Sequence, residues 1–136
     1  MMLILESLLK LKSKQGDVTA AFLHADVGKD ETIYIEIPLG FRKNGKALKL
    51  NKTLYGHWQS SRMFWKYLSK AMNDVGVKTL QFDPCMFVGD RVIAVAFVDD
   101  LLFWSTDDKY IQALGAKLLE QGLLPEEEYD AAGVLG

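Results

Sequence analysis

The sequence predicts an α+β fold in which helices pack on one face of an antiparallel sheet. Three observations predict it. Apolar and polar residues alternate strictly over Thr32–Ile37, as in a strand. Two apolar runs flank Asp99 and Asp100 and are short enough to be the strands of a hairpin. Apolar side chains recur with helical spacing from Ser60 to about Val75. Long helices between antiparallel strands favour a layered architecture.

The length and composition are those of a globular domain. The chain has 136 residues, enough for one domain with a hydrophobic core. Hydrophobic residues make up 49% of it and charged residues 25%, which is ordinary for a soluble protein. Cys85 is the single cysteine, which excludes an internal disulfide and a cysteine-based zinc site and fits a reducing compartment.

The start of the chain predicts neither a signal peptide nor a membrane anchor. The apolar run Met1–Leu5 is too short to span a bilayer, and Glu6 and Lys10 follow it closely. It also lacks a basic start and a small-residue cleavage site. We therefore expect an intracellular protein, cytoplasmic or nuclear, with no membrane partner.

The first half of the chain predicts one helix and two strands. Leucines form an approximate apolar stripe over residues 2–12, which favours a helix that Gly16 breaks. Thr32–Ile37 is a strand that ends at Pro38 and Gly40. A turn at Asn44-Gly45 leads to a short strand over Ala47–Leu50.

The second half predicts two helices and a hairpin. The helix from Ser60 carries a basic ridge on its polar face, formed by Arg62, Lys66 and Lys70. Strands follow at Cys85–Val88, Val92–Val98 and 101–104. The last helix is capped by Ser105 or Thr106 and ends near Gly122, and residues 126–136 look like a strand cut short.

Asp99 and Asp100 are the strongest candidates for residues of a functional site. Aspartates are common in turns for backbone reasons alone. A carboxylate pair also suits hard cations such as magnesium, which prefer oxygen ligands. Asp17 precedes another mostly apolar stretch, where it could cap a short helix or supply a third carboxylate.

The charge is unevenly distributed. Residues 42–78 contain nine Lys or Arg and one acid, for a net +8, whereas residues 99–130 contain nine acids and two lysines, for a net −7. This split suggests a polyanionic partner beside a metal-binding region. The alternative is a pair of solvated helix faces of opposite sign that attract each other.

Three ordered blocks resemble the reverse transcriptase of copia-type long-terminal-repeat retrotransposons. Asp17–Leu23 looks like the first catalytic block of its palm domain. Leu54–Trp65 is similar to the Leu-Tyr-Gly-Leu-Lys-Gln-Ala/Ser-Pro-Arg block, and Phe97–Asp100 to the Tyr/Phe-Val-Asp-Asp box. A single tetrapeptide of this kind is weak evidence for the family. Three blocks in the family's order are strong evidence, and the resemblance covers nearly the whole chain.

The resemblance implies an RNA-directed DNA polymerase with a palm-like fold. Asp17 and Asp99 would be the main ligands of two magnesium ions, which manganese could replace, and Asp100 would complete the acidic site. An RNA or DNA template-primer and deoxynucleoside triphosphates would be the partners. The oligomeric state is left open.

The resemblance also assigns residues around the nucleotide. Phe22 resembles a steric gate against the ribose 2′-hydroxyl, although a core phenylalanine is the plainer interpretation. Gln59 and Arg62 resemble residues near the incoming nucleotide and template. Lys66 and Lys70 would contact nucleic-acid phosphates.

The chain departs from the family in two ways. Ser61 stands where the family usually has proline, and His57-Trp58 replaces Leu-Lys, which removes one basic residue. We also expect residues 1–136 to be a single truncated palm domain without the fingers segment, thumb and ribonuclease H regions. By this expectation the chain alone polymerises DNA feebly or not at all and needs the other polyprotein regions.

Two alternatives stay open. The chain could be a non-enzymatic remnant or co-opted module that binds nucleic acid or protein through its basic 42–78 region. It could also be a phospho-acceptor receiver domain, which clusters aspartates on a parallel sheet. The hairpin position of Asp99 and Asp100 argues against the receiver.

Overall fold

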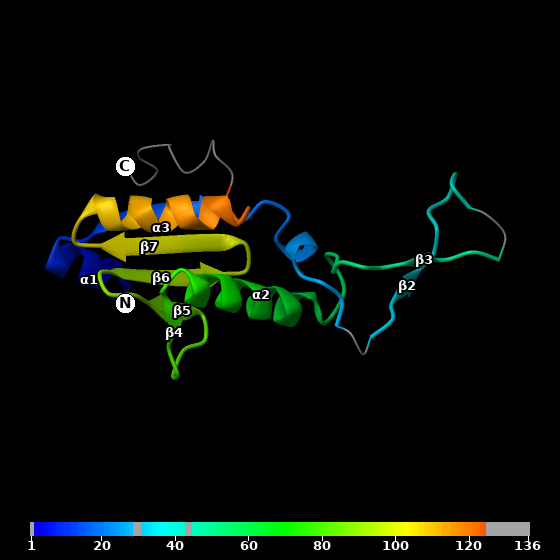
Figure 1. Ribbon diagram of the computed structural model, residues 1–136, viewed down its shortest axis with the longest axis horizontal. Helices are drawn as coiled ribbons and strands as arrows, with labels where there is room; N and C mark the ends of the chain where they lie inside the picture. The colour runs from blue at the N-terminus through cyan, green and yellow to red at the C-terminus, as the bar shows by residue number, and fades with distance from the viewer. Residues whose placement is uncertain (1, 29–30, 43–44, 125–136) are drawn as a thin grey trace. The chain divides into compact units, whose positions relative to one another are not determined.

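The computed structural model describes residues 2–28, 31–42 and 45–124 (Figure 1). Its helices are α1 (Met2–Leu9), α2 (Ser60–Asp74) and α3 (Asp108–Glu120), with a 3₁₀ turn, η1, at Ala21–His24. Its strands are β1 (Lys12–Asp17), β2 (Tyr34–Ile35), β3 (Leu48–Lys49), β4 (Lys78–Thr79), β5 (Met86–Val88), β6 (Val92–Phe97) and β7 (Asp100–Ser105). Residues 126–136, expected to begin a strand, lie outside the described residues. No helix in the described ranges is long and apolar enough to cross a membrane.

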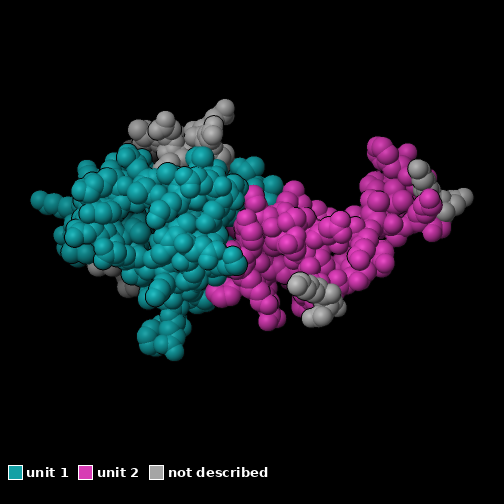
Figure 2. Space-filling view, in the orientation of Figure 1, with its two compact units in different colours: residues 1–21, 68–136 teal, residues 22–67 magenta. Residues whose placement is uncertain are grey.

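The chain forms two compact units, shown in different colours in Figure 2. The first unit comprises residues 1–21 and 68–136, and the second comprises residues 22–67, so the boundary falls inside α2. The first unit holds a five-stranded sheet in the order β1-β7-β6-β5-β4, in which every neighbouring pair is antiparallel. An antiparallel sheet with helices is therefore confirmed, and it excludes the parallel sheet that a receiver domain requires.

One face of this sheet forms the core of the first unit. Strand alternation places on it the buried residues Gly16, Phe87, Ala94, Leu101 and Phe103. Helix α3 packs over β1 and β7 on this side (Figure 1). A Cβ at Gly16 would lie only 2.9 Å from the Leu124 side chain, so glycine lets this segment approach the sheet closely.

The opposite face is partly open and carries the polar residues of β1. Ser13, Gln15 and Asp17 alternate with the core positions and lie on this face. Helix α1 reaches it through Glu6, whose carboxylate accepts hydrogen bonds from Ser13 Oγ at 2.7 Å and Trp104 Nε1 at 2.9 Å. These bonds lower the pKa of Glu6, the Ser13 bond more than the Trp104 bond. The expectation that helices pack on one face holds for α3, whereas α1 bonds to the other face.

Several element boundaries differ from the sequence expectations. The first helix ends at Leu9 instead of residue 12, and Lys10 has a left-handed φ of 52°. The last helix is capped by Asp107, whose side chain accepts from Lys109 N, and not by Ser105 or Thr106. Ser105 Oγ instead accepts a hydrogen bond from Asp107 N at 3.3 Å. The sequence pattern gave no sign of β1 or β4.

The described residues of the second unit contain one small sheet, the antiparallel pair β2 and β3. Its most buried polar contact is the hydrogen bond that Thr53 Oγ1 donates to the carbonyl oxygen of Phe22. Phe22 also packs edge-on against Phe64 of α2, with ring centroids 5.9 Å apart. These contacts fix η1 and the start of α2 together within this unit.

Candidate active site at the end of the β1–β7 ladder

Asp17 and Asp100 form the last residue pair of the ladder between β1 and β7. The next pair is hydrogen-bonded, because Val18 N donates to Asp99 O at 2.7 Å. Hydrogen-bonded and non-hydrogen-bonded pairs alternate, so Asp17 and Asp100 form a non-hydrogen-bonded pair, in which Cα atoms are about 4.5 Å apart. Asp17 thus ends a strand and does not cap a helix, and its side chain shares a face with Asp100.

Asp99 lies beside this pair in the turn between β6 and β7. Phe97 pairs with Asp100, which leaves Val98 and Asp99 as the two turn residues. Val98 has a φ of 57°, a conformation that two-residue hairpins normally assign to glycine or asparagine and that is strained for a β-branched side chain. The turn therefore lies one residue earlier than the Asp99–Asp100 turn expected from the sequence: Val98 leaves the expected strand, and Asp100 is the first residue of β7.

The environment of Asp17 disfavours its negative charge. Partial burial raises the pKa of Asp17, and the negative charges of Asp99 and Asp100 raise it further. Like charges directly opposite each other weaken a strand pair. Gln15, two residues before Asp17, donates from Nε2 to Asp100 Oδ1 at 3.0 Å and so orients that carboxylate. This arrangement favours a proton or a cation at the acidic end.

The donor chemistry of this cluster suits magnesium, although the protein side chains do not complete a site. Carboxylate oxygens are the ligands that magnesium prefers. The pKa of Asp17 is raised first by burial and then by the negative charges of Asp99 and Asp100, both of which a bound cation would offset. Across the described ranges, no three His, Cys, Asp or Glu side chains are arranged to hold a metal ion. Magnesium normally keeps several waters and takes substrate phosphates beside one or two carboxylates.

Phe22 lies in the second unit and is largely buried. Its side chain is 7% exposed, and its ring meets the ring of Tyr55 edge-on with centroids 4.5 Å apart. Tyr55 is 55% exposed and forms the solvent-facing member of the pair. Tyr55 cannot be recognised from the sequence as a partner of Phe22, since an aromatic residue ahead of a glycine turn gives no signal of which ring it contacts.

Gln59, Arg62 and Lys66 lie at the start of α2, also in the second unit. Gln59 is partly buried, and its carbonyl oxygen accepts the hydrogen bond of Met63 N at 3.0 Å. Arg62 and Lys66 are exposed. Lys70 belongs to the first unit and forms an ion pair of 2.8 Å with Asp74. The basic ridge is thus open at its first two positions and partly neutralised at its third.

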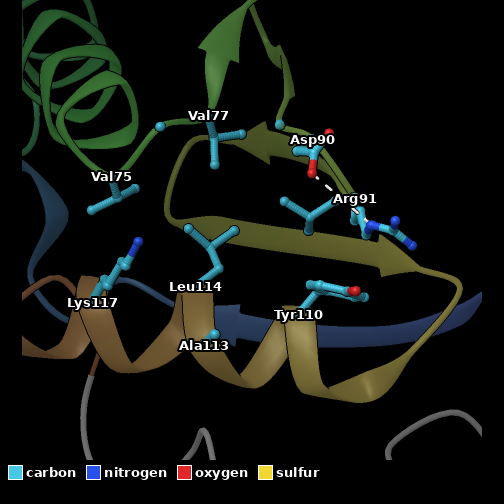
Figure 3. A pocket seen from close by; sticks show the side chains of 11 residues that line it. Val75, Val77, Asp90, Arg91, Tyr110, Ala113, Leu114 and Lys117 are labelled. Carbon is cyan, nitrogen blue, oxygen red and sulfur yellow. Dashed lines mark ion pairs between the residues drawn. The ribbon is translucent and has the colours of Figure 1, made fainter.

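A small pocket of about 200 Å³ lies away from the acidic cluster (Figure 3). It is lined by residues 75–77, which follow α2, by the β5–β6 turn and by α3, and Leu114 and Val77 point toward each other within it. Arg91 and Lys117 add positive charge to its lining, and Asp90, 4.0 Å from Arg91, adds a negative charge. Arg91 precedes β6, whereas Asp99 follows that strand, so the pocket and the carboxylates adjoin opposite ends of β6.

Comparisons with known proteins identify what the chain is similar to. Residues 5–124 match the family described as reverse transcriptase (RNA-dependent DNA polymerase). The retrovirus-related Pol polyprotein from transposon TNT 1-94 of Nicotiana tabacum is 35% identical over 124 residues, which are 85% of this chain and 9% of that polyprotein. The transposon Ty1-MR1 Gag-Pol polyprotein of Saccharomyces cerevisiae is 29% identical over 130 residues, which are 88% of this chain and 7% of that polyprotein. The chain therefore spans less than a tenth of either relative.

Proposed function

The chain belongs to the reverse transcriptase (RNA-dependent DNA polymerase) family, and we propose that it carries the catalytic carboxylates of such an enzyme. The match to TNT 1-94 and Ty1 polyproteins agrees with a fragment of copia-type retrotransposon origin. The observation that supports the catalytic assignment best is the convergence of Asp17, Asp99 and Asp100 at one end of the sheet. The fold around them would be the palm of the polymerase.

Asp17, Asp99 and Asp100 would hold two magnesium ions, with manganese as a substitute. When bound, such ions would activate the attacking hydroxyl and stabilise the leaving pyrophosphate in nucleotidyl transfer. The three carboxylates supply negative charge, and Gln15 holds Asp100 in its orientation. Waters and triphosphate oxygens would complete the coordination.

The remaining roles come from the family resemblance and are proposed residue by residue. Phe22 would border the sugar and disfavour a 2′-hydroxyl, with the Tyr55 ring packed against it. Gln59 and Arg62 would lie near the incoming deoxynucleotide, and Lys66 and Lys70 would meet nucleic-acid phosphates. Feeble polymerisation by the chain alone, and its dependence on other polyprotein regions, stay predictions that a primer-extension assay on an RNA template tests.

Amide NMR with a manganese titration tests the assignment of the carboxylates. Mn²⁺ broadens resonances near its binding site, so we expect selective loss of the Asp17, Asp99 and Asp100 signals. Asp99→Asn should weaken the broadening about tenfold or more, because removing one charged ligand weakens a site that has few protein donors. Asp90→Asn is the matched control, since Asp90 is a fully exposed acid before β6. Equal broadening at Asp90, or none at the three carboxylates, would sink the proposal.

A non-catalytic nucleic-acid-binding module is the second candidate. The exposed side chains of Arg62 and Lys66 support it, because a solvent-facing basic ridge binds phosphates without any metal. Salt-dependent binding of RNA by a variant that lacks all three carboxylates, together with absent manganese broadening in the native chain, would favour this candidate over the polymerase.

A further inference from the structure

The pocket of Figure 3 lies wholly within the first unit and has an apolar floor. Val77, Val92 and Leu114 form this floor, and none of them is more than 8% exposed. Pockets that hold drug-sized molecules measure about 300–1,000 Å³. With a volume of about 200 Å³, this pocket has room for one apolar group of side-chain size.

Backbone hydrogen bonds hold two walls of the pocket in place. After α2, Gly76 has a left-handed φ of 91°, and Val77 N donates to Met72 O at 2.9 Å, as in a Schellman cap. In the β5–β6 turn, Gly89 N donates to Val92 O at 2.8 Å. The pocket is therefore shaped before a ligand arrives, which lowers the entropy cost of binding.

Glycine at position 89 leaves the floor of the pocket accessible. The backbone of Gly89 is not in the left-handed region, so the turn itself does not require glycine there. A Cβ at this position would lie 3.1 Å from Cγ1 of Val92 and 3.4 Å from Cγ2 of Val77. A larger residue would therefore place atoms over the two valines of the floor.

One cation of the lining is open to a ligand. The Lys117 side chain runs from α3 toward Val75 at one end of the pocket (Figure 3). Among the described residues, Lys117 forms no ion pair. Arg91, by contrast, has its guanidinium 5.4 Å from the centroid of the Tyr110 ring and its Nε 4.0 Å from Asp90. An anionic group in the pocket would therefore meet Lys117.

We propose that this pocket binds a small organic carboxylate, with its apolar body between Val77 and Leu114 and its carboxylate on the Lys117 ammonium group. The apolar body gains from leaving water, and the carboxylate gains a charge-assisted hydrogen bond. Strand β6 has six residues, so its two ends are about 17 Å apart, and the ligand would not touch the acidic cluster. This binding site is separate from the proposed polymerase site and does not depend on it.

An amide NMR titration of the full chain with three matched probes tests the site. Phenylacetate carries both a ring and a carboxylate, phenylacetamide carries the ring without the charge, and acetate carries the charge without the ring. We expect phenylacetate to shift the signals of Val77, Gly89 and Leu114 with a Kd of about 1 mM, as for an efficient ligand of about ten heavy atoms. The other two probes should bind about 10-fold more weakly or not at all.

Substitutions separate the charge of the pocket from its shape. Lys117→Gln should weaken phenylacetate about 10-fold and leave phenylacetamide unchanged, because only the carboxylate uses the charge. Ala113→Leu adds an apolar side chain to the lining from an exposed position of α3 and should abolish binding of both probes, while leucine keeps a high helix propensity. Lys46→Gln is the matched control, since Lys46 is an exposed lysine of the second unit that does not line the pocket.

Three results would overturn the proposed site. Equal affinities for phenylacetate and phenylacetamide, or an unchanged affinity in Lys117→Gln, would show that Lys117 does not bind a carboxylate. Retained binding in Ala113→Leu would place the probe outside the pocket. Absence of a saturable shift with phenylacetate would show that the pocket does not take this class of ligand. Manganese broadening at the acidic cluster, recorded on the same sample, tells whether the proposed function fails separately.

Discussion

Asp17 and Asp100 lie directly opposite each other in the last pair of the β1–β7 ladder, with their side chains on the same face. Partial burial and the two neighbouring carboxylates raise the pKa of Asp17. A cross-strand pair of like charges weakens a sheet, so the polypeptide is less stable here than a neutral pair would make it. A site that binds a cation gains from such an arrangement, because the cation removes the repulsion.

Asp17→Asn should therefore stabilise the metal-free chain at pH 7, by about 0.5 kcal/mol. The folded-state pKa of Asp17 is raised above its ordinary value of 3.8. The ionised Asp17 carboxylate therefore destabilises the folded state, and this loss of stability develops as the pH rises through the folded pKa. Below pH 3.8 Asp17 is protonated in both the folded and the unfolded state, so the stability gained from Asp17→Asn should vanish. Urea denaturation in a chelator at pH 7 and near pH 3 measures the difference. An equal gain at both pH values, or a gain from Asp90→Asn, would contradict this origin.

The contribution of Glu6 to stability is expected to depend on pH in the opposite direction to that of Asp17. Bonds from Ser13 and Trp104 lower the pKa of Glu6 below its ordinary value of 4.5, so its stabilising effect is present above that value and is lost as the pH falls through the folded pKa. The Trp104 indole N–H resonance should shift with a midpoint below 4.5. Glu6→Gln should abolish the shift. A midpoint at or above the ordinary value would show that these bonds do not form in solution.

Val98→Asn should raise the free energy of unfolding by about 1 kcal/mol, because a left-handed conformation is costly for a β-branched residue and tolerated by asparagine. Val98 is 46% exposed, so little packing is lost. The midpoint of urea denaturation measures the change. Val88→Asn, in the extended backbone of β5, is the control and should lower stability. A loss of stability in both variants would mean that the turn is not strained.

Thr53→Val should lower the stability of the second unit by about 1–2 kcal/mol, because the carbonyl oxygen of Phe22 would lose a buried hydrogen-bond donor. Thr53→Ser keeps the hydroxyl and removes one methyl group, so its cost should be smaller, about 0.8 kcal/mol. Hydrogen exchange of amides in residues 22–67 measures the effect on this unit. The account of this contact fails if valine is tolerated better than serine.

The sequence predicted those elements whose hydrophobic pattern is strong. The hairpin of β6 and β7 was predicted from two apolar runs around two aspartates. Helix α2 was predicted from apolar residues at helical spacing, among them Leu68 and Met72, which are buried. The tight turn at Asp99 was predictable for the same reason. These elements can be recognised locally, because the order of apolar and polar side chains along the chain shows which face of each element is buried.

Other features depend on tertiary contacts that leave no such signal. Strand β1 is an edge strand with lysines on one face and polar residues on the other, and its one buried position is Gly16, which has no side chain. Because β1 could not be predicted, the sequence did not show that Asp17 ends a strand opposite Asp100. For the same reason it did not show that Gln15 donates a hydrogen bond to the Asp100 carboxylate. The Tyr55–Phe22 contact joins residues far apart in the chain, so spacing gave no hint of it.

The most direct test of the account is a ¹³C NMR titration of the Asp17 side-chain carboxyl, with and without magnesium. We expect a pKa above 3.8 in a chelator, because of burial and the neighbouring charges, and a pKa below that value when magnesium is present. This result would show that Asp17 belongs to a cation-binding site. A pKa that magnesium leaves unchanged would contradict the central claim that this end of the sheet is a polymerase metal centre.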